Sequence, residues 1–376
     1  MNENTDIHEH LVCSGSGDRY PVDTRLWRSP AGAYFDLAFT PHFPRDRILD
    51  RAPGMWRYRE ALPFPLHEVP VSFDEGFTPM PRVPIHGHGV YLKQEQLFPS
   101  GSYKDRGASM LISHARRIGI THCVEDSSGN AGSAIAAYCA RAGISCEIYV
   151  PEDTSPSKLA QIRSYGAQLK PVPGNREATA EAVMAAAETS FYASHVWNPY
   201  FFHGTKTFAF EVWEQLGFTV PDALILPAGN GTLLIGTAIG FEELYRAGEV
   251  PAVPRLYGVQ AALCAPLART ATPAPNGDTV AEGIAIARPA RGAQILDKVG
   301  HSGGGIVTVT EEQISHTLGH LCRQGFFIEP TSAATLAAVP EVLSRPEFAN
   351  KQPVVVTLCS GHGLKAAEKV EKLVRS

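Results

Sequence analysis

From about residue 90 onward, the sequence alternates between short apolar runs and amphipathic stretches of helical period. The apolar runs predict strands at 90–93, 122–125, 145–150, 168–172, 223–227, 256–260 and 354–358. The periodic stretches predict helices at 104–117, 130–142, 157–165 and 232–247. Because apolar strands separated by helices form parallel sheets covered on both faces, the pattern indicates an α/β fold with ligands at the carboxyl ends of its strands.

Length and composition narrow the class of protein further. The 376 residues exceed what one compact core usually holds, so we expect two domains. Lys and Arg number 33 against 38 Asp and Glu, which leaves no basic excess for a nucleic-acid or acidic-membrane partner. No apolar run approaches the roughly 20 residues of a membrane helix, and the polar N-terminus does not resemble a signal peptide. We therefore expect a cytoplasmic protein.

The cysteines and histidines do not predict a metal site. The seven cysteines are scattered without a CxxC pair, and the 14 histidines lack an HxxxH or HExxH pair. Cys123, Cys139 and Cys146 lie in apolar runs and are expected to be small core residues.

The segment Ser100–Gly107 reads SGSYKDRG and places Lys104 at the start of a predicted helix. The positive end of a helix disfavours an ammonium charge, which suits an amine that must attack an aldehyde. The alternative is a solvated cluster of charges that opens a helix.

A second segment, Ser127–Gly132, follows a strand and opens a helix with the sequence SSGNAG. Its backbone N–H groups and hydroxyls form an anion site fit for a substrate carboxylate, and Asn130 could hydrogen-bond a phenolic oxygen. The candidate carboxylate-binding residues are Ser127, Ser128, Gly129 and Ala131. The alternative is an ordinary turn in which a serine caps the helix.

Two further loops follow apolar strands. Pro227–Thr232 reads PAGNGT, where glycines let the backbone wrap a single phosphate at a helix start; it is neither a Walker sequence nor a GxGxxG fingerprint. Ser360, in the segment CSGHGLK, offers a neutral hydroxyl at the end of the last strand. Taken alone, either loop could be a glycine-rich turn.

Together the four segments describe an aldehyde cofactor with one phosphate, a pyridine nitrogen and a phenolic oxygen, which is pyridoxal 5'-phosphate (PLP). The chain resembles the fold type II PLP enzymes, and most closely the threonine synthases, from about residue 10 to 370. The resemblance implies a two-domain α/β fold like that of the tryptophan synthase β chain, with two mainly parallel sheets covered by helices. It also implies a homodimer.

The resemblance assigns roles residue by residue. Lys104 would form the Schiff base, Asn130 would contact the ring oxygen, and Ser360 would face the ring nitrogen. The phosphate would lie on Gly229, Asn230, Gly231 and Thr232. The implied domains are an N-terminal extension, residues 1–65, packed on a large PLP-binding domain of residues 66–100 and 201–376, with a smaller mobile domain at 101–200. The extension resembles a degenerate, metal-free zinc ribbon, since Ser replaces its metal-binding cysteines.

The chain also departs from the threonine synthase pattern. Phe201 stands where the family has the arginine that binds the phosphate of O-phosphohomoserine, and His195, His203 and Lys206 are candidate replacements. For Lys206 a structural role is the favoured interpretation, because the family has a lysine at that position too. Segment 281–285 resembles serine/threonine ammonia-lyases, whereas segment 258–261 resembles threonine synthases.

The sequence thus predicts a PLP-dependent lyase that acts on a small β- or γ-substituted amino acid, by elimination or by elimination and replacement. A neutral Ser360 would make the ring a weaker electron sink, which favours these reactions over transamination. Authentic threonine synthase, which converts O-phosphohomoserine and water to threonine and phosphate, is the first alternative. A binding protein that keeps PLP without turnover is the second.

Overall fold

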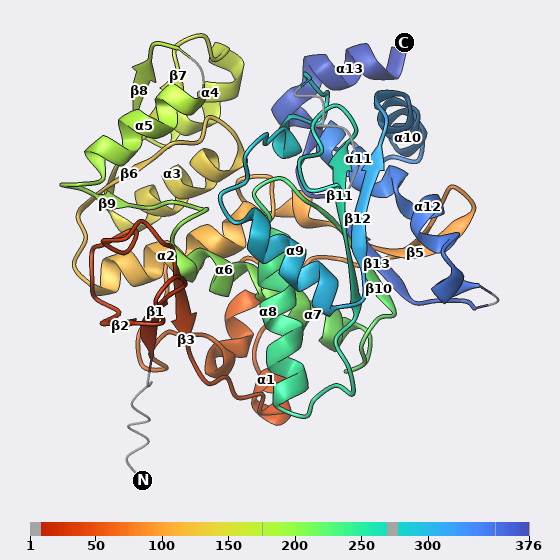
Figure 1. Cartoon of the computed structure of the whole chain (residues 1–376), viewed down its shortest axis with the longest axis horizontal. Coiled ribbons are helices and arrows are strands. Elements are labelled where there is room, and N and C mark those ends of the chain that lie inside the picture. Colours follow the sequence, from red (N-terminus) through yellow and green to blue (C-terminus); the bar gives the residue numbers. More distant parts are fainter. Residues whose placement is uncertain (1–8, 175, 269–276, 350, 376) are drawn as a thin grey trace. The chain divides into compact units, whose positions relative to one another are not determined.

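The computed structural model describes residues 9–174, 176–268, 277–349 and 351–375 (Figure 1). The chain divides into two compact units. Unit 1 contains residues 1–76 and 104–205, and unit 2 contains residues 77–103 and 206–376. The N-terminal residues therefore group with residues 104–205, whereas the sequence had led us to expect residues 1–65 on the larger domain.

Unit 1 is built on a four-stranded parallel sheet in the order β8-β7-β6-β9. Its strands are β6 (His122–Glu125), β7 (Ser145–Pro151), β8 (Gln168–Val172) and β9 (Phe191–Tyr192). Its helices are α2 (Lys104–Arg117), α3 (Asn130–Ala142), α4 (Pro156–Ser164), α5 (Arg176–Ala186) and α6 (Pro199–Thr205). α2 packs between α3 and α6, and both α3 and α5 pack on β7 (Figure 1). Cys123, Cys139 and Cys146 are buried here, as expected of core residues.

The N-terminal part of unit 1 adds a small antiparallel sheet, β2-β1-β3. Its strands are β1 (His10–Cys13), β2 (Arg19–Tyr20) and β3 (Phe35–Ala38), followed by α1 (Arg45–Asp50) and the 3₁₀ turns of η1 (Met55–Ala61). Strands of two to four residues leave too little alternation for the sequence to predict them. The side chains of Cys13 and Phe35 pack into the same core as α2 and α3.

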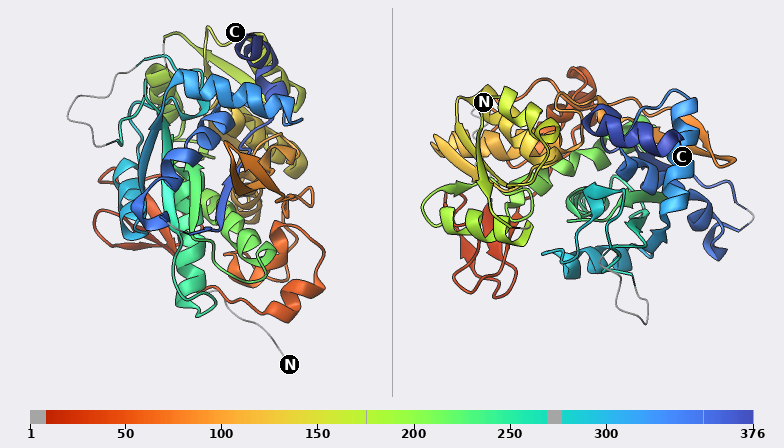
Figure 2. Two further views of the ribbon diagram at one scale, coloured as in Figure 1. Left: turned by 90° about the vertical axis from the view of Figure 1, so that its right-hand side faces the viewer. Right: turned by 90° about the horizontal axis from the view of Figure 1, so that it is seen from above.

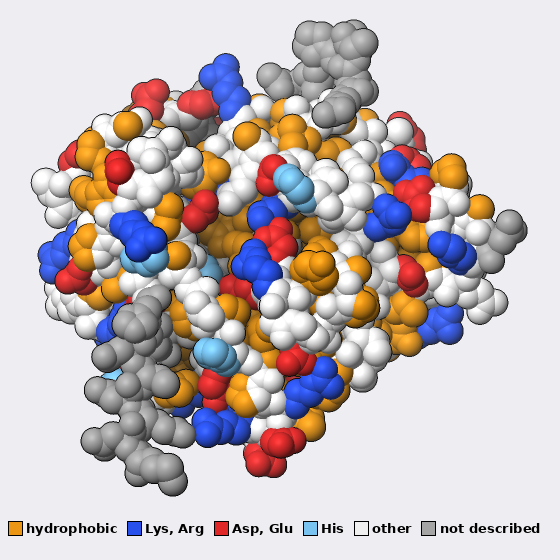
Figure 3. All heavy atoms as spheres, turned by 60° about the horizontal axis from the view of Figure 1, so that its bottom comes forward, with side chains coloured by type: hydrophobic (Ala, Val, Ile, Leu, Met, Phe, Trp, Pro, Cys, Tyr) orange, Lys and Arg blue, Asp and Glu red, His pale blue; other side chains and the backbone are white. Residues whose placement is uncertain are grey.

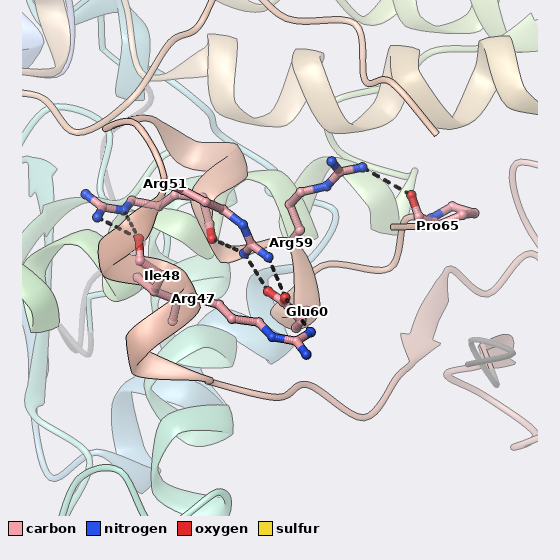
Figure 4. Close-up of polar contacts among 7 residues, drawn as sticks. Arg47, Ile48, Arg51, Arg59, Glu60 and Pro65 are labelled. Atoms are coloured by element: carbon pink, nitrogen blue, oxygen red, sulfur yellow. Dashed lines mark hydrogen bonds and ion pairs between the residues drawn. The ribbon is translucent and has the colours of Figure 1, made fainter. Parts of the chain in front are cut away.

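The N-terminal part of unit 1 ends with an arginine-rich segment, residues 45–65 (Figure 4). Arg51 donates two hydrogen bonds to the Glu60 carboxylate, at 2.5 and 2.6 Å, and a third to the Arg57 carbonyl oxygen at 2.7 Å. Arg59 donates to the carbonyl oxygen of Pro65 at 3.5 Å. Two parallel bonds fix both planar groups, so Glu60 joins α1 to η1.

Unit 2 is built on a six-stranded sheet in the order β12-β11-β10-β13-β5-β4. The strands are β4 (Arg82–Ile85), β5 (His88–Lys93), β10 (Ala223–Pro227), β11 (Arg255–Ala261), β12 (Gly305–Val309) and β13 (Val355–Leu358). All neighbours are parallel except the edge hairpin of β4 and β5. β10 is buried over its whole length, which is the pattern of a central strand covered on both faces.

Helices cover this sheet (Figures 1 and 2). They are α7 (Thr207–Gln215), α8 (Thr232–Arg246), α9 (Gly292–His301), α10 (Glu311–Arg323), α11 (Pro330–Ala337), α12 (Val339–Leu343) and α13 (Ala367–Arg375). Short 3₁₀ turns are η2 (Glu95–Leu97), η3 (Glu282–Ile284), η4 (Pro346–Phe348) and η5 (Gly363–Ala366). α11 packs on β10, β11 and β13, with α10 beside it, whereas α8 packs on β10 and β11 and against α7. One core joins Ile225 and Val259 of the sheet to Leu318 of α10 and Ala333 of α11.

The predicted α/β class, with two mainly parallel sheets covered by helices, is confirmed. The helices expected at 104–117 and 130–142 and the strands expected at 122–125, 168–172 and 223–227 have the predicted bounds. Within the described ranges, every helix is too short or too polar to span a bilayer. On the face shown in Figure 3, Lys and Arg side chains lie among Asp and Glu side chains rather than in one basic patch.

Candidate active site

In unit 2, the segment that precedes Lys104 pairs with the segment that follows β13. The backbone N–H of Tyr103 donates to the Ser360 carbonyl oxygen at 3.2 Å, and that of His362 donates to the Gly101 carbonyl oxygen at 2.9 Å. The Lys365 ammonium donates to the Ser100 carbonyl oxygen at 2.8 Å. Residues 100–103 and 359–365, from two segments that the sequence marked separately, therefore lie side by side within unit 2.

Tyr103 links the same segment to the predicted phosphate loop. Its phenolic oxygen lies 3.0 Å from the hydroxyl oxygen of Thr232, and both side chains are buried. Lys104 is the next residue in the chain and the first of α2. Three of the four candidate segments thus meet around residues 100–103 of unit 2, directly before Lys104.

The loop between β10 and α8 requires its glycines. Gly231 precedes α8 with φ +72°, a left-handed conformation, and a Cβ there would lie 2.4 Å from the Ile295 side chain. A Cβ on Gly229 would lie 3.0 Å from the Gly283 carbonyl oxygen. No side chain caps the start of α8, so the N–H groups of its first turn suit an anion. This loop fits the single phosphate that the sequence predicts.

Gln260 braces the same loop, a role that the sequence did not reveal. Its amide nitrogen donates to the Ala228 carbonyl oxygen at 2.9 Å, and its amide oxygen accepts from the Leu267 N–H at 2.9 Å. Gln260 is fully buried on β11. Its position within the segment 258–261, noted for its threonine-synthase-like sequence, was the one available signal.

Ser360 lies at the carboxyl end of β13 and is 2% exposed. Its hydroxyl oxygen is 3.0 Å from that of Ser332 on α11. The Ser332 oxygen also accepts the N–H groups of Ser360 at 2.8 Å and Gly361 at 3.3 Å. With both lone pairs engaged, Ser332 donates its own hydrogen to Ser360. Ser360 then keeps its hydrogen to donate, which suits a bond to an unprotonated pyridine nitrogen.

The predicted carboxylate loop belongs to unit 1, between β6 and α3. Gly129, not a serine, precedes the first residue of α3, and no side chain caps this helix. The hydroxyl oxygen of Ser127 accepts the Gly129 N–H at 3.3 Å. A Cβ on Gly132 would lie 1.8 Å from the Ser127 carbonyl oxygen, so the tight turn requires glycine there. The simpler reading of a serine-capped helix does not hold, and the first-turn N–H groups of α3 suit a carboxylate.

Phe201 lies beside Lys104 in unit 1. The Phe201 side chain is fully buried, and its ring centre is 5.8 Å from the Lys104 ammonium nitrogen and 6.1 Å from the centre of the His195 ring. A Cβ on Gly107 would lie 2.3 Å from the Phe201 ring. The position that the family pattern gives to an arginine is therefore filled by hydrocarbon packed on α2.

Glu125 and His195 form a buried pair in the same unit. The Glu125 side chain is fully buried at the last position of β6, and its Oε1 lies 2.6 Å from His195 Nδ1. Burial raises the pKa of Glu125 to about 8, against the opposing effects of the Asp126 backbone N–H and the Lys104 charge. Next to it, the Tyr192 hydroxyl donates to Asp126 at 2.7 Å. Glu125 is a site residue that the sequence motifs do not mark, although its place at the carboxyl end of a strand was a signal.

The other two candidate cations, Lys206 and His203, are buried side chains. Lys206 is fully buried in unit 2 and makes an ion pair with Glu243, with nitrogen–oxygen distances of 2.8 and 2.9 Å. Burial lowers the pKa of Lys206 and raises that of Glu243. His203 is 4% exposed on α6.

The residues of both units fit PLP by their chemistry. Unit 2 offers an uncapped, glycine-bound helix start and a hydroxyl that can donate to a pyridine nitrogen. Unit 1 offers a half-buried lysine and a second uncapped helix start. The individual contacts of these residues with the cofactor stay predictions.

Comparison with known proteins agrees with this chemistry. Residues 71–360 match the family model described as "Pyridoxal-phosphate dependent enzyme". The threonine synthase of Methanocaldococcus jannaschii is 32% identical over 94% of this chain and 92% of its own length.

Two solved structures resemble the fold. The processed form of threonine deaminase isoform 2 from Solanum lycopersicum has a TM-score of 0.66 at 21% identity, over 79% of this chain and 83% of that one. Serine racemase from Dictyostelium discoideum has a TM-score of 0.61 at 25% identity, over 76% and 92% of the two chains.

Proposed function

Since the chain belongs to the pyridoxal-phosphate-dependent enzyme family, we propose that it is a lyase that removes the β-substituent of a small amino acid. The unsaturated substrate fragment that remains after elimination is either released as a keto acid with ammonia, or it adds another nucleophile at the β-carbon. Bound PLP supplies an aldehyde that joins the substrate amine and a ring that withdraws electrons from the α-carbon.

We assign the residues of the chain as follows. Lys104 would hold the cofactor through its amine and, when its amine is free, would remove the α-proton of the substrate as general base. Asn130 contacts the ring oxygen, and Ser360 donates to the ring nitrogen. The cofactor phosphate lies on Gly229, Asn230, Gly231 and Thr232.

The loop of residues 127–131 holds the substrate carboxylate. Support comes from the start of α3, where no side chain caps the first-turn N–H groups. A carboxylate at this helix start is stabilised by these N–H groups and by the helix dipole. Because α3 packs on α2, the helix that begins with Lys104, a carboxylate fixed here would lie in the same unit as the general base.

The choice of substrate class rests on Phe201. The fully buried Phe201 ring occupies the position of the expected phosphate-binding arginine. A hydrocarbon ring cannot stabilise a dianion, and losing a bidentate guanidinium at such a site would cost several kcal/mol. The site therefore favours a small substrate with an uncharged β-substituent over O-phosphohomoserine.

Authentic threonine synthase stays the alternative, because the M. jannaschii relative of that name is similar over nearly the whole chain. In that case His195, His203 or Lys206 would have to bind the substrate phosphate. A PLP-binding protein without turnover is the remaining alternative.

Incubation of the PLP-loaded protein with four substrates separates these functions. We expect keto acid and ammonia from L-serine or L-threonine, with little turnover of D-serine. Threonine and phosphate from O-phosphohomoserine would establish the synthase instead. A spectral change on substrate addition without any product would indicate the binding protein.

The role of Lys104 has its own test. Borohydride reduction of the loaded protein should add the mass of a reduced pyridoxyl phosphate, and Lys104→Ala should abolish this adduct. Lys372→Ala, on the exposed face of α13, is the matched control and should retain it. We also propose a homodimer in the cytoplasm, and light scattering of the loaded protein tests the dimer.

A further inference from the structure

The Glu125–His195 pair has an unused oxygen. Glu125 Oε1 is bonded to His195 Nδ1 at 2.6 Å, whereas Oε2 is buried without a hydrogen-bond partner among the described residues. Unpaired buried polar atoms are costly and uncommon, so an atom in this state calls for an explanation.

The tautomer of His195 determines which oxygen of Glu125 carries the acid proton. Burial raises the pKa of Glu125 to about 8, so the carboxyl group is mainly protonated at pH 7. If His195 donates Nδ1–H to Oε1, the acid hydrogen is on Oε2. Both groups are then neutral, as their burial requires, and the one atom without a partner is the one that carries a transferable proton.

Lys104 is electrostatically coupled to this acid. A positive charge on Lys104 lowers the pKa of Glu125. When Lys104 takes the α-proton of a substrate it becomes charged, and Glu125 then becomes a stronger acid. Removal of the first proton therefore promotes delivery of the second.

The place of Glu125 in the fold suits contact with the substrate. It ends β6, and the loop of residues 127–131, to which we assign the substrate carboxylate, begins two residues later. The other polar groups around it are the backbone N–H groups of Asp126 and His195, which lower its pKa, the Asp126 carboxylate, which accepts from Tyr192, and the thiols of Cys123 and Cys146 on the paired strands. Glu125 and Lys104 belong to the same unit.

We propose that Glu125, oriented by His195, is the acid that protonates the leaving group, and that the substrate is accordingly a β-hydroxy amino acid. The inference rests on the proposed elimination and names its substrate class. Hydroxide is a poor leaving group and needs a proton, whereas a phosphate or halide departs without one.

The proton balance closes. Lys104 takes the α-proton, and the electron pair of that C–H bond forms the double bond to the β-carbon. The β C–O bond breaks with its electron pair on oxygen, which takes the Oε2 proton and leaves as water. The Glu125 carboxylate left behind accepts the His195 N–H until the proton that Lys104 took from the α-carbon returns to Oε2, so that both groups are restored and the substrate has lost one water.

The role of Glu125 as the acid is tested by comparing substrates with two different leaving groups. Glu125→Gln preserves shape but cannot transfer a proton, so we expect kcat on L-serine to fall by about 10²–10⁴-fold. Turnover of β-chloro-L-alanine, which loses chloride, should stay within about tenfold of wild type. Glu147→Gln is the control, since it removes a carboxylate from the neighbouring strand β7, where it pairs with Lys170 at 3.1 Å, and it should change neither rate.

Equal losses on both substrates, or none on either, would overturn the role of Glu125. If the wild-type enzyme eliminated from neither substrate, the proposed function itself would fail before any variant was compared. Infrared spectra of the cofactor-free protein at pH 7 give an independent readout. A carboxylic-acid C=O band present in wild type and missing in Glu125→Gln is expected, and its absence from wild type would refute the neutral acid.

His195 has a separate signature. Its N–H stabilises the Glu125 carboxylate, so His195→Ala should raise the pKa of Glu125 and move the alkaline limb of kcat/KM on L-serine to higher pH. An unmoved limb would show that His195 does not orient the acid.

Discussion

The ring of Phe201 packs directly against the Cα of Gly107, at a place where a Cβ on residue 107 would lie 2.3 Å from a ring carbon. Gly107 is in the second turn of α2, and Phe201 is in α6, so this contact sets how closely the two helices approach. The residue that stands in place of the family's arginine is therefore part of the core of unit 1.

Gly107→Ala should destabilise unit 1, although alanine is the better helix former. Overpacking costs about 1–3 kcal/mol, which outweighs the gain of up to about 1 kcal/mol in helix propensity. Gly300 in α9 is the control, since a Cβ there meets nothing within 4 Å, and Gly300→Ala should be neutral or stabilising. Urea unfolding measures both. Equal stability of the two variants would mean that Phe201 yields easily.

The second prediction concerns the role of Ser332 in cofactor binding. Ser332→Ala removes the acceptor of two N–H groups and the donor to Ser360. We expect PLP to bind about tenfold more weakly, equivalent to about 1.4 kcal/mol, by absorbance titration of the cofactor-free protein. Thr335→Val is the control, because Thr335 on the same helix bonds only the Thr331 carbonyl oxygen among the contacts described. The same loss in both variants would indicate a general disturbance of α11.

The strands and helices that carry the candidate loops were predictable because each one is periodic or wholly apolar. β10 at 223–227 and α3 at 130–142 have the bounds that the sequence indicates. The N-terminal sheet was not predictable from the sequence. Its strand β2 has only two residues, and the sheet is stabilised by side chains of α2 and α3 that are distant in sequence.

The loops of the site were predictable because glycine and serine patterns at strand ends indicate tight turns and anion-binding helix starts. The supporting residues were not. Gln260, Ser332 and Glu125 act through partners 28 to 70 residues away, and only the fold brings these pairs together. His195 was noted as a possible cation, but its partner Glu125 was not.

A third prediction concerns pH. Burial, with the nearby Arg117 charge, lowers the pKa of His114 to about 3, and its ring stacks on Tyr200 at 3.6 Å. The unfolded chain binds this proton near pH 6.5, so between pH 6.5 and 3 the unfolded state holds more protons. Stability should therefore fall as the pH falls through this window, by up to about 1.4 kcal/mol per unit.

Urea unfolding of wild type and His114→Gln between pH 7 and 4 tests this. The variant loses packing at every pH but should show a flatter dependence on pH, because glutamine does not titrate. Parallel pH profiles would assign the acid sensitivity to other groups.

The last prediction concerns Lys206, which the sequence offered as a phosphate-binding candidate. Lys206→Met should lower the free energy of unfolding by about 3–5 kcal/mol, because it leaves the buried Glu243 carboxyl without its partner. Adding Glu243→Gln removes that charge and should recover part of the loss.

Unfolding in urea, followed by circular dichroism, measures both variants of Lys206. A double variant no more stable than Lys206→Met would argue against a mainly structural ion pair. If Lys206→Met kept its stability yet lost turnover of O-phosphohomoserine alone, Lys206 would be a substrate ligand, and the balance would move toward threonine synthase.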